Sequence, residues 1–170
     1  MAETIAHSIS LRPVPLTRAR FAPYGDVIDA SHDAVKSMNE ARFERFDDLC
    51  NVDLGGGGVA ISVTRARTAT VLPLRVDRVE RHPLGSQAFV PLSHCTMVVV
   101  VARPGEAVVA GDVRAFVTNG RQVINYHRGT WHMPLIAFDV GQEYLVVDRA
   151  GSEPNCDEHE LDTVVMLEAP

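Results

Sequence analysis

The most regular feature of this sequence is a series of short runs rich in Val, Ile, Thr and Phe, separated by Gly, Pro, Asn and Asp. β-Branched and aromatic residues favour strands, and the separating residues favour turns. The pattern predicts strands at residues 26–28, 59–65, 76–82, 87–92, 96–103, 114–118, 122–126, 135–138, 144–148 and 163–167. No long stretch with helical periodicity lies between these runs, so we expect an all-β fold, a barrel or a sandwich.

Few segments carry a helical or a loop signal. Phe43 and Phe46 recur three residues apart among charged residues, which predicts a helix over residues 39–49. A helical turn is also predicted near residues 106–111. Four glycines at residues 55–58 precede a strand and lack the Gly-Lys-Ser/Thr of phosphate-binding loops, so they indicate a flexible loop. We therefore expect one or two short helices beside the strands.

Asn119 and Gly120 form the clearest turn signal of the chain. They lie between the strands predicted at residues 114–118 and 122–126. Asn-Gly tolerates the two positive φ angles of a tight type I′ turn, which joins antiparallel neighbours. The sequence thus predicts that these two strands form a hairpin.

Length and hydrophobic content favour one core and a single domain over residues 1–170, since 46% of the residues are hydrophobic. Residues 97–101 are apolar on both faces of a predicted strand. In an antiparallel sheet this means that both faces are covered, either by a second sheet or by another subunit. On this ground we expect a homodimer.

Charge and composition exclude several classes of partner. Sixteen Lys and Arg residues stand against 22 Asp and Glu, a net charge of −6, and the basic residues are scattered, so no nucleic-acid partner is expected. No apolar run reaches the roughly 20 residues that span a bilayer, and no targeting motif is recognisable, so we expect a cytoplasmic protein without a membrane partner. Cys50, Cys95 and Cys156 suit a reducing compartment and are expected to be bystanders to the chemistry.

Polar residues gather on the strand predicted at residues 76–82. Alternation places Arg78, Glu80 and His82 on one of its faces. If this face lines a barrel, its side chains must be satisfied by each other, by a metal or by a ligand, because an unpaired buried charge is costly. After the turn at residues 83–85 the chain can return Gln87 to the same lining, so a small-molecule site is expected here.

The spacing of these residues resembles the two motifs of the cupins. Glu80, His82 and Gln87 have the spacing of the first motif, His-x-His-(x)3–4-Glu, with two ligand types changed. Residues 129–132, Gly-Thr-Trp-His, supply the Gly-x-x-His of the second motif, which ends at His132. The alternative is a surface ion pair together with a packed histidine. The resemblance implies a cupin-like β-barrel or sandwich.

Longer blocks resemble one particular family, the ureidoglycolate lyases. These blocks are residues 80–91, 114–120 and 125–132. The likeness extends from about Leu11 to residues 155–157, and the chain departs from the family pattern at Met133 and at Pro154. It implies a cupin-like, usually dimeric enzyme of allantoin and purine degradation that splits (S)-ureidoglycolate into glyoxylate and urea.

This reaction requires an acid–base pair and an anchor for the substrate carboxylate. The hydroxyl of the carbinolamide loses a proton as the carbonyl of glyoxylate forms, and the leaving urea gains one. We expect His82 or Glu80 to act as the base and His132 as its partner, because imidazole titrates near neutral pH. Arg78 or Arg128 is the expected anchor. The residues expected to bind substrate are Arg78, Ser86, Gln87, Tyr126, His127 and Arg128.

Two questions stay open at this point. Glu80, His82, Gln87 and His132 could hold a divalent transition metal of the Ni or Zn type, or could act without one as acid, base and hydrogen-bonding groups. No organic cofactor is expected. The activity also has alternatives: a non-catalytic cupin module that binds glyoxylate or a related small acid, or an amidohydrolase that releases ammonia and carbon dioxide instead of urea.

Overall fold

The computed structural model describes residues 8–30 and 35–170 and is almost entirely β. Its elements are β1 (Ser8–Leu11), β2 (Val14–Pro15), α1 (Arg18–Phe21), β3 (Gly25–Ile28), β4 (Val35–Met38), β5 (Phe43–Phe46), β6 (Gly58–Arg65), β7 (Leu74–Arg81), β8 (Gln87–Pro91), β9 (Val98–Ala102), η1 (Ala110–Asp112), β10 (Arg114–Val117), β11 (Val123–Tyr126), β12 (Trp131–His132), β13 (Glu143–Ala150) and β14 (Asp157–Leu167). The expected all-β, cupin-like fold with short helices is confirmed.

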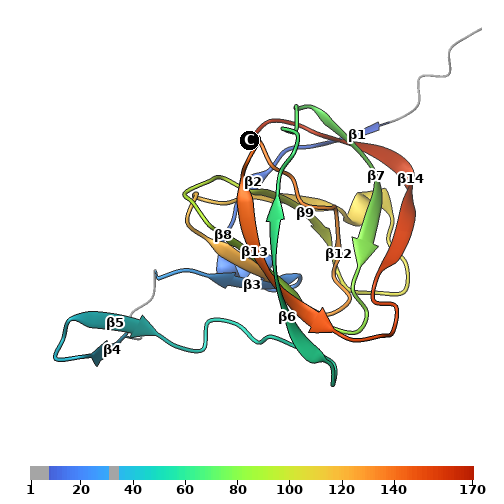
Figure 1. Cartoon of the computed structure of the whole chain (residues 1–170). Coiled ribbons are helices and arrows are strands. Elements are labelled where there is room, and N and C mark those ends of the chain that lie inside the picture. Colours follow the sequence, from blue (N-terminus) through green and yellow to red (C-terminus); the bar gives the residue numbers. More distant parts are fainter. Residues whose placement is uncertain (1–7, 31–34) are drawn as a thin grey trace, which may run out of the picture.

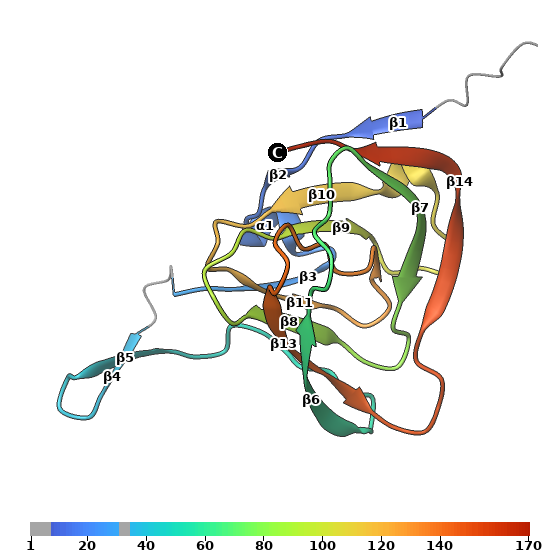
Figure 2. The ribbon, with the colours of Figure 1, turned by 45° about the horizontal axis from the view of Figure 1, so that its top comes forward.

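Two larger sheets build the body of the protein. A seven-stranded sheet has the order β1-β14-β7-β12-β9-β10-β2, and a five-stranded sheet has the order β3-β11-β8-β13-β6. Together they curl into an open barrel (Figure 1). The hairpin of β4 and β5 extends away from this body (Figure 2).

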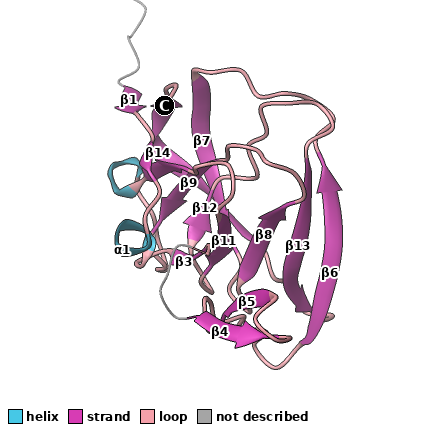
Figure 3. Ribbon diagram, turned by 90° about the vertical axis from the view of Figure 1, so that its left-hand side faces the viewer, coloured by secondary structure: helices cyan, strands magenta, loops and turns pink. Residues whose placement is uncertain are grey.

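Figure 3 shows the two sheets lying over one another, and the main core cluster takes its residues from both of them. Val99 and Val101 of β9 pack there against Tyr144 of the facing sheet. Val98 and Val100 are buried in a second cluster on the other face of β9. Both faces of the apolar run are therefore covered within one chain, so this run alone gives no reason to expect a second subunit.

The predicted hairpin at Asn119 and Gly120 is wrong. β10 pairs with β9 and β2 in the seven-stranded sheet, whereas β11 pairs with β3 and β8 in the five-stranded sheet. Only Gly120 of the pair has a positive φ, +89°, and the Asn119 side chain accepts a hydrogen bond from the Arg121 N–H at 3.0 Å. The turn therefore carries the chain from one sheet to the other, because each strand has better partners elsewhere.

The helix predicted over residues 39–49 is also wrong, because β4 and β5 form a hairpin there with Met38 opposite Phe43. Phe43 is 60% exposed. A short helix depends on packing of its apolar face, and this segment packs no such face on the body. The helical turn expected near residues 106–111 is confirmed in part by η1. In the parts of the chain that the structure describes, no helix has the length and apolar character of a membrane span.

Two predicted strand features differ from the structure. Residues 135–138 form no strand, although Ile136 is buried in the second core cluster. The alternation predicted for residues 76–82 is interrupted, because Val76 and Val79 are both buried although they lie three residues apart. The ladder of β7 with β14 contains a register shift opposite Val76 to Arg78, in the same part of β7 as this interruption.

Candidate active site

Glu80, His82 and His132 come together at one end of β7. Glu80 lies on β7 directly opposite His132 of β12, and His82 follows the last residue of β7. Directly opposed residues of an antiparallel pair project from the same face of the sheet. One potential ligand atom from each of the three residues lies within 4.8 Å of the others. The spacing of the two cupin-like motifs thus located residues that are close in space.

Backbone carbonyls orient both imidazoles. His82 Nδ1 lies 2.6 Å from the Asn155 carbonyl oxygen, and His132 Nδ1 lies 3.2 Å from the Met133 carbonyl oxygen. A carbonyl only accepts hydrogen bonds, so each Nδ1 donates its proton, and in the neutral imidazole this leaves the lone pair on Nε2. Both Nε2 atoms are buried and contact no hydrogen-bond partner among the described residues. These buried acceptor atoms are suited to bind a ligand or a metal ion.

The surroundings shift the proton affinities of these groups in opposite directions. Burial, with a contribution from nearby His82, lowers the pKa of His132 to about 3, so this imidazole is neutral at physiological pH. Burial raises the pKa of the Glu80 carboxyl. A neutral imidazole suits an acceptor or ligand role, whereas a carboxyl with a raised pKa suits proton transfer nearer to neutral pH.

Tyr126 forms a wall of this site. Its ring stacks on His132 with a centroid distance of 4.4 Å and an interplanar angle of 14°. Burial and the neighbouring Glu80 raise the pKa of its hydroxyl, which therefore stays protonated. Gln87 is the register partner of Tyr126 on β8, and its Nε2 donates to Asp148 at 3.3 Å. The Gln87 Oε1 is buried and contacts no donor among the described residues.

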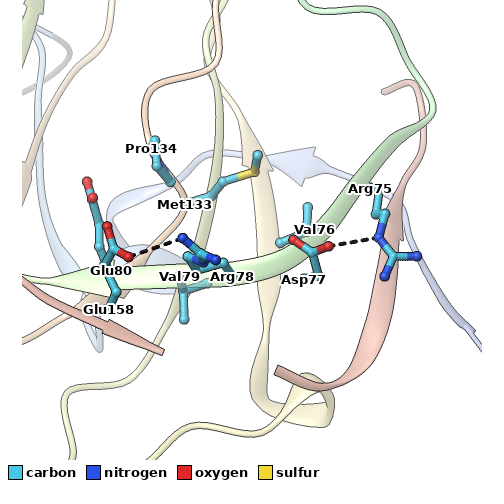
Figure 4. Close-up of a pocket in the computed structure, with 9 residues that line it drawn as sticks. All are labelled: Arg75, Val76, Asp77, Arg78, Val79, Glu80, Met133, Pro134 and Glu158. Carbon is cyan, nitrogen blue, oxygen red and sulfur yellow. Dashed lines mark hydrogen bonds and ion pairs between the residues drawn. The ribbon is translucent and has the colours of Figure 1, made fainter. Parts of the chain in front are cut away.

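A pocket of about 290 Å³ lies beside Glu80 (Figure 4). It is lined by Arg75, Val76, Asp77, Arg78, Val79, Glu80, Met133, Pro134 and Glu158. β7 and β12 share only one residue pair, and Pro134 has no N–H with which to extend the ladder. The pocket occupies the space where the two segments separate. Arg78 borders it and pairs with Glu158 at 3.2 Å and with Glu160 at 3.4 Å.

Three other predicted residues engage polar groups outside the cluster of Glu80, His82 and His132. Ser86 Oγ accepts a hydrogen bond from the Asp53 N–H at 2.9 Å, and Arg128 pairs with the Asp53 carboxylate at 2.6 Å. His127 Nε2 lies 3.1 Å from the Asp26 carboxylate. The contacts with Asp53 join loop residues to each other, and the contact of His127 with Asp26 joins a loop to β3. A role in substrate binding stays a prediction for all three.

Sequence reasoning missed Asn155 and Cys156, which directly precede β14 and lie beside the site. Besides the contact of the Asn155 carbonyl with His82, the Cys156 Sγ lies 3.8 Å from Glu80 Oε2. Cys156 was expected to be a bystander. The resemblance included residues 155–157, but only the antiparallel pairing of β14 with β7 shows which residues they contact.

Comparisons with known proteins show the family of this chain. The family model described as ureidoglycolate lyase matches residues 8–168. A ureidoglycolate lyase of Pseudomonas fluorescens (strain SBW25) is 49% identical over 147 residues, which cover 85% of this chain and 87% of that protein. Ureidoglycolate lyases of Pseudomonas aeruginosa (strain LESB58) and Pseudomonas putida (strain W619) are 45% and 46% identical, covering 88% and 90% of this chain and 89% and 92% of their own lengths. The chain therefore belongs to the ureidoglycolate lyase family.

Proposed function

We propose that this protein cleaves (S)-ureidoglycolate into glyoxylate and urea by acid–base elimination at Glu80, His82 and His132. Its family and the names of its relatives support this substrate. The observation that carries the chemistry is the pair of buried, unpartnered Nε2 atoms of His82 and His132 next to a carboxylate. These groups offer two acceptors and a proton carrier within reach of one small molecule.

Each group has a role that fits its surroundings. His82 or Glu80 takes the proton from the substrate hydroxyl as the carbonyl forms and the C–N bond breaks, and the leaving nitrogen of urea is protonated from the same centre. His132, which is buried and neutral, accepts a hydrogen bond and orients the hydroxyl. The stacked ring of Tyr126 limits the movement of His132.

Substrate binding uses groups around this centre. We place the substrate carboxylate next to Arg78, because Arg78 and Glu80 line the same pocket. The unpartnered Gln87 Oε1 is an acceptor suited to the N–H groups of the ureido moiety. Arg128 is the weaker candidate for the anchor, because it does not line this pocket and its pair with Asp53, at 2.6 Å, is shorter than the pairs of Arg78 with Glu158 and Glu160.

The product assay is the experiment that tests this function. Freshly prepared ureidoglycolate is given to the purified protein, and glyoxylate, urea and ammonia are quantified after correction for spontaneous decay. Accelerated release of urea and glyoxylate in equal amounts is expected. Ammonia without urea would make the protein an amidohydrolase. No acceleration, with or without divalent metal ions, would favour a module that only binds glyoxylate or a related acid.

As the alternative to these acid–base roles, we propose that Glu80, His82 and His132 act as ligands of a divalent transition metal of the Ni or Zn type, with Gln87 as a weak fourth ligand. The donor set fits, because two imidazoles with free Nε2 atoms and a carboxylate lie within 4.8 Å of one another. When bound, such a metal lowers the pKa of a coordinated hydroxyl.

Elemental analysis of protein purified without a histidine tag tests this metal site. About one equivalent of metal is expected in the native protein, and a large loss is expected in the His82→Ala variant. His94→Ala is the control, because His94 lies beside Gly120 and away from the three ligands. Less than about a tenth of an equivalent, with activity that persists in chelator, would contradict the proposal.

The protein is also proposed to be a homodimer. β6 is an edge strand, and three alternate residues on one of its faces, Val59, Ile61 and Val63, are 56%, 67% and 57% exposed. An apolar edge of this kind favours pairing with a second copy. We place this homodimer in the cytoplasm, because Cys50, Cys95 and Cys156 are all free, which suits a reducing compartment.

Replacing Ile61 with Lys tests this interface. The charge would be buried between the two copies, so the variant is expected to elute as a monomer when its mass is measured by light scattering during gel filtration. Val71→Lys is a matched control, because Val71 is 79% exposed and lies outside β6. Wild-type protein that is already monomeric would rule out the interface.

A further inference from the structure

The segment that leads into β14 touches two of the three residues of the active centre. The Asn155 carbonyl oxygen accepts the His82 Nδ1–H at 2.6 Å, and the Cys156 Sγ lies 3.8 Å from Glu80 Oε2. The Asn155 side chain accepts a hydrogen bond from the Leu84 N–H at 2.7 Å, so the segment is itself anchored. We name residues 155–156 the β14 strap.

The register of the sheet fixes where this strap lies. β14 runs antiparallel to β7, with Asp157 opposite Arg81 and Glu158 opposite Glu80. Arg81 also donates to the Asp157 carboxylate at 2.9 Å and lies over the Trp131 ring at 4.7 Å. The strap is therefore continuous with a strand that is paired with β7, and its own hydrogen bonds reach Glu80 of β7 and the turn that follows β7.

Glu80 has little else to hold it. Among the residues that the structure describes, the Cys156 thiol is the one hydrogen-bond donor to its carboxylate, and His132 Nδ1 lies farther away, at 3.9 Å from Oε1. A free glutamate side chain samples several rotamers, and each departure from the reactive orientation lowers the rate. A thiol is a weak donor, but it suffices to bias the orientation of a half-buried carboxylate.

We propose that Cys156 is a positioning residue for the lyase reaction: its S–H donates to Glu80 Oε2 and holds this carboxylate beside the two imidazoles. Asn155 does the same for His82 through its backbone carbonyl, which keeps the Nε2 lone pair directed at the substrate. This inference rests on the proposed function. It assigns Cys156 no covalent step, because the thiol acts only through Glu80.

Two substitutions at Cys156 separate hydrogen bonding from packing. Cys156→Ala removes the donor and is expected to lower kcat about five- to ten-fold, with KM within about two-fold of the wild type, as for loss of one hydrogen bond of about 1 kcal/mol. Cys156→Ser keeps a donor and is expected to restore most of the rate. Cys50→Ala is the control, because this half-buried free cysteine lies next to Asp26 instead of Glu80.

The outcomes distinguish this inference from the proposed function. A wild-type protein that does not cleave ureidoglycolate would overturn the proposed function. An active wild type with an unchanged kcat in Cys156→Ala would overturn the positioning role alone, and so would a Cys156→Ser variant as slow as Cys156→Ala.

A second measurement does not depend on turnover. Alkylation by iodoacetamide, followed by peptide mass analysis, is expected to slow several-fold at Cys156 when the unreactive carboxylate oxalate is bound. The rate at Cys50 should stay the same. Equal rates at Cys156 with and without saturating oxalate would show that this thiol does not border the ligand site.

Discussion

Replacing Glu80 with Gln is expected to lower kcat/KM for ureidoglycolate by about 10²- to 10⁴-fold, the usual contribution of a general acid or base. Glutamine has nearly the same shape but cannot take up a proton. His82→Ala should produce a loss of similar size. It removes a buried Nε2 acceptor that has no hydrogen-bond donor among the described residues and is therefore available to the substrate. The measurement is the initial rate of urea formation above the spontaneous rate.

The melting temperature is the control for both variants. The Glu80 carboxylate is only partly buried and makes a single hydrogen bond to the described residues, so Glu80→Gln should unfold close to the wild-type temperature. His94→Ala should keep the wild-type rate. Glu80→Gln and His82→Ala proteins that both stay within about ten-fold of the wild type would show that the chemistry takes place elsewhere.

Phe21→Ala is expected to lower the free energy of unfolding by about 3–5 kcal/mol, as for other buried Phe→Ala changes. Phe21 ends α1 and is 0% exposed. Its ring lies 5.6 Å from that of Phe116 and 6.3 Å from that of Tyr126. Because Tyr126 stacks on His132, the cavity should also loosen the site and reduce kcat.

Denaturant titration measures the loss in Phe21→Ala. Phe43→Ala is the matched control, since the Phe43 ring is 60% exposed on the β4–β5 hairpin and its removal should change the free energy by less than about 0.5 kcal/mol. Equal effects of the two substitutions would mean that the aromatic cluster around Phe21 is not part of the cooperative core.

Local patterns predicted the strands well but not how they are joined. Runs of β-branched residues identified β6, β9 and β13, although only β13 alternates against a core: β9 is buried on both faces, and β6 is an edge strand with exposed apolar residues. The chain bends at Asn119 and Gly120, but not in the expected tight hairpin turn, and the strands beside this bend belong to different sheets. Pairing is decided by partners that are distant in sequence, and no dipeptide encodes them. The helix predicted at residues 39–49 was wrong for a related reason. The spacing of apolar residues does not show whether the rest of the protein lies where they could pack against it.

The same distinction applies to the site. Glu80, His82 and His132 could be predicted because short motifs fix their spacing on neighbouring strands. Cys156 could not, since 76 residues separate it from Glu80 and only the β14–β7 ladder brings them together. The hydrogen bond that orients His82 could not be predicted either. Its acceptor is the backbone carbonyl of Asn155, and because every residue has such a carbonyl, the residue type gives no signal.

Pro134 ends the short strand that carries His132, and this has a consequence for substrate range. The N–H of Met133 donates to Val100 on β9, so the next amide would face β7, and proline supplies none there. The backbone at Pro134 thus leaves β7 and β12 unpaired beyond His132, and the pocket beside Glu80 lies where they are unpaired. Changes at Met133 or Arg78 can therefore retune the fit to different small acids while the strands and the proton-transfer groups stay in place. The range of substrates can therefore change through substitutions that leave the proton-transfer groups unchanged.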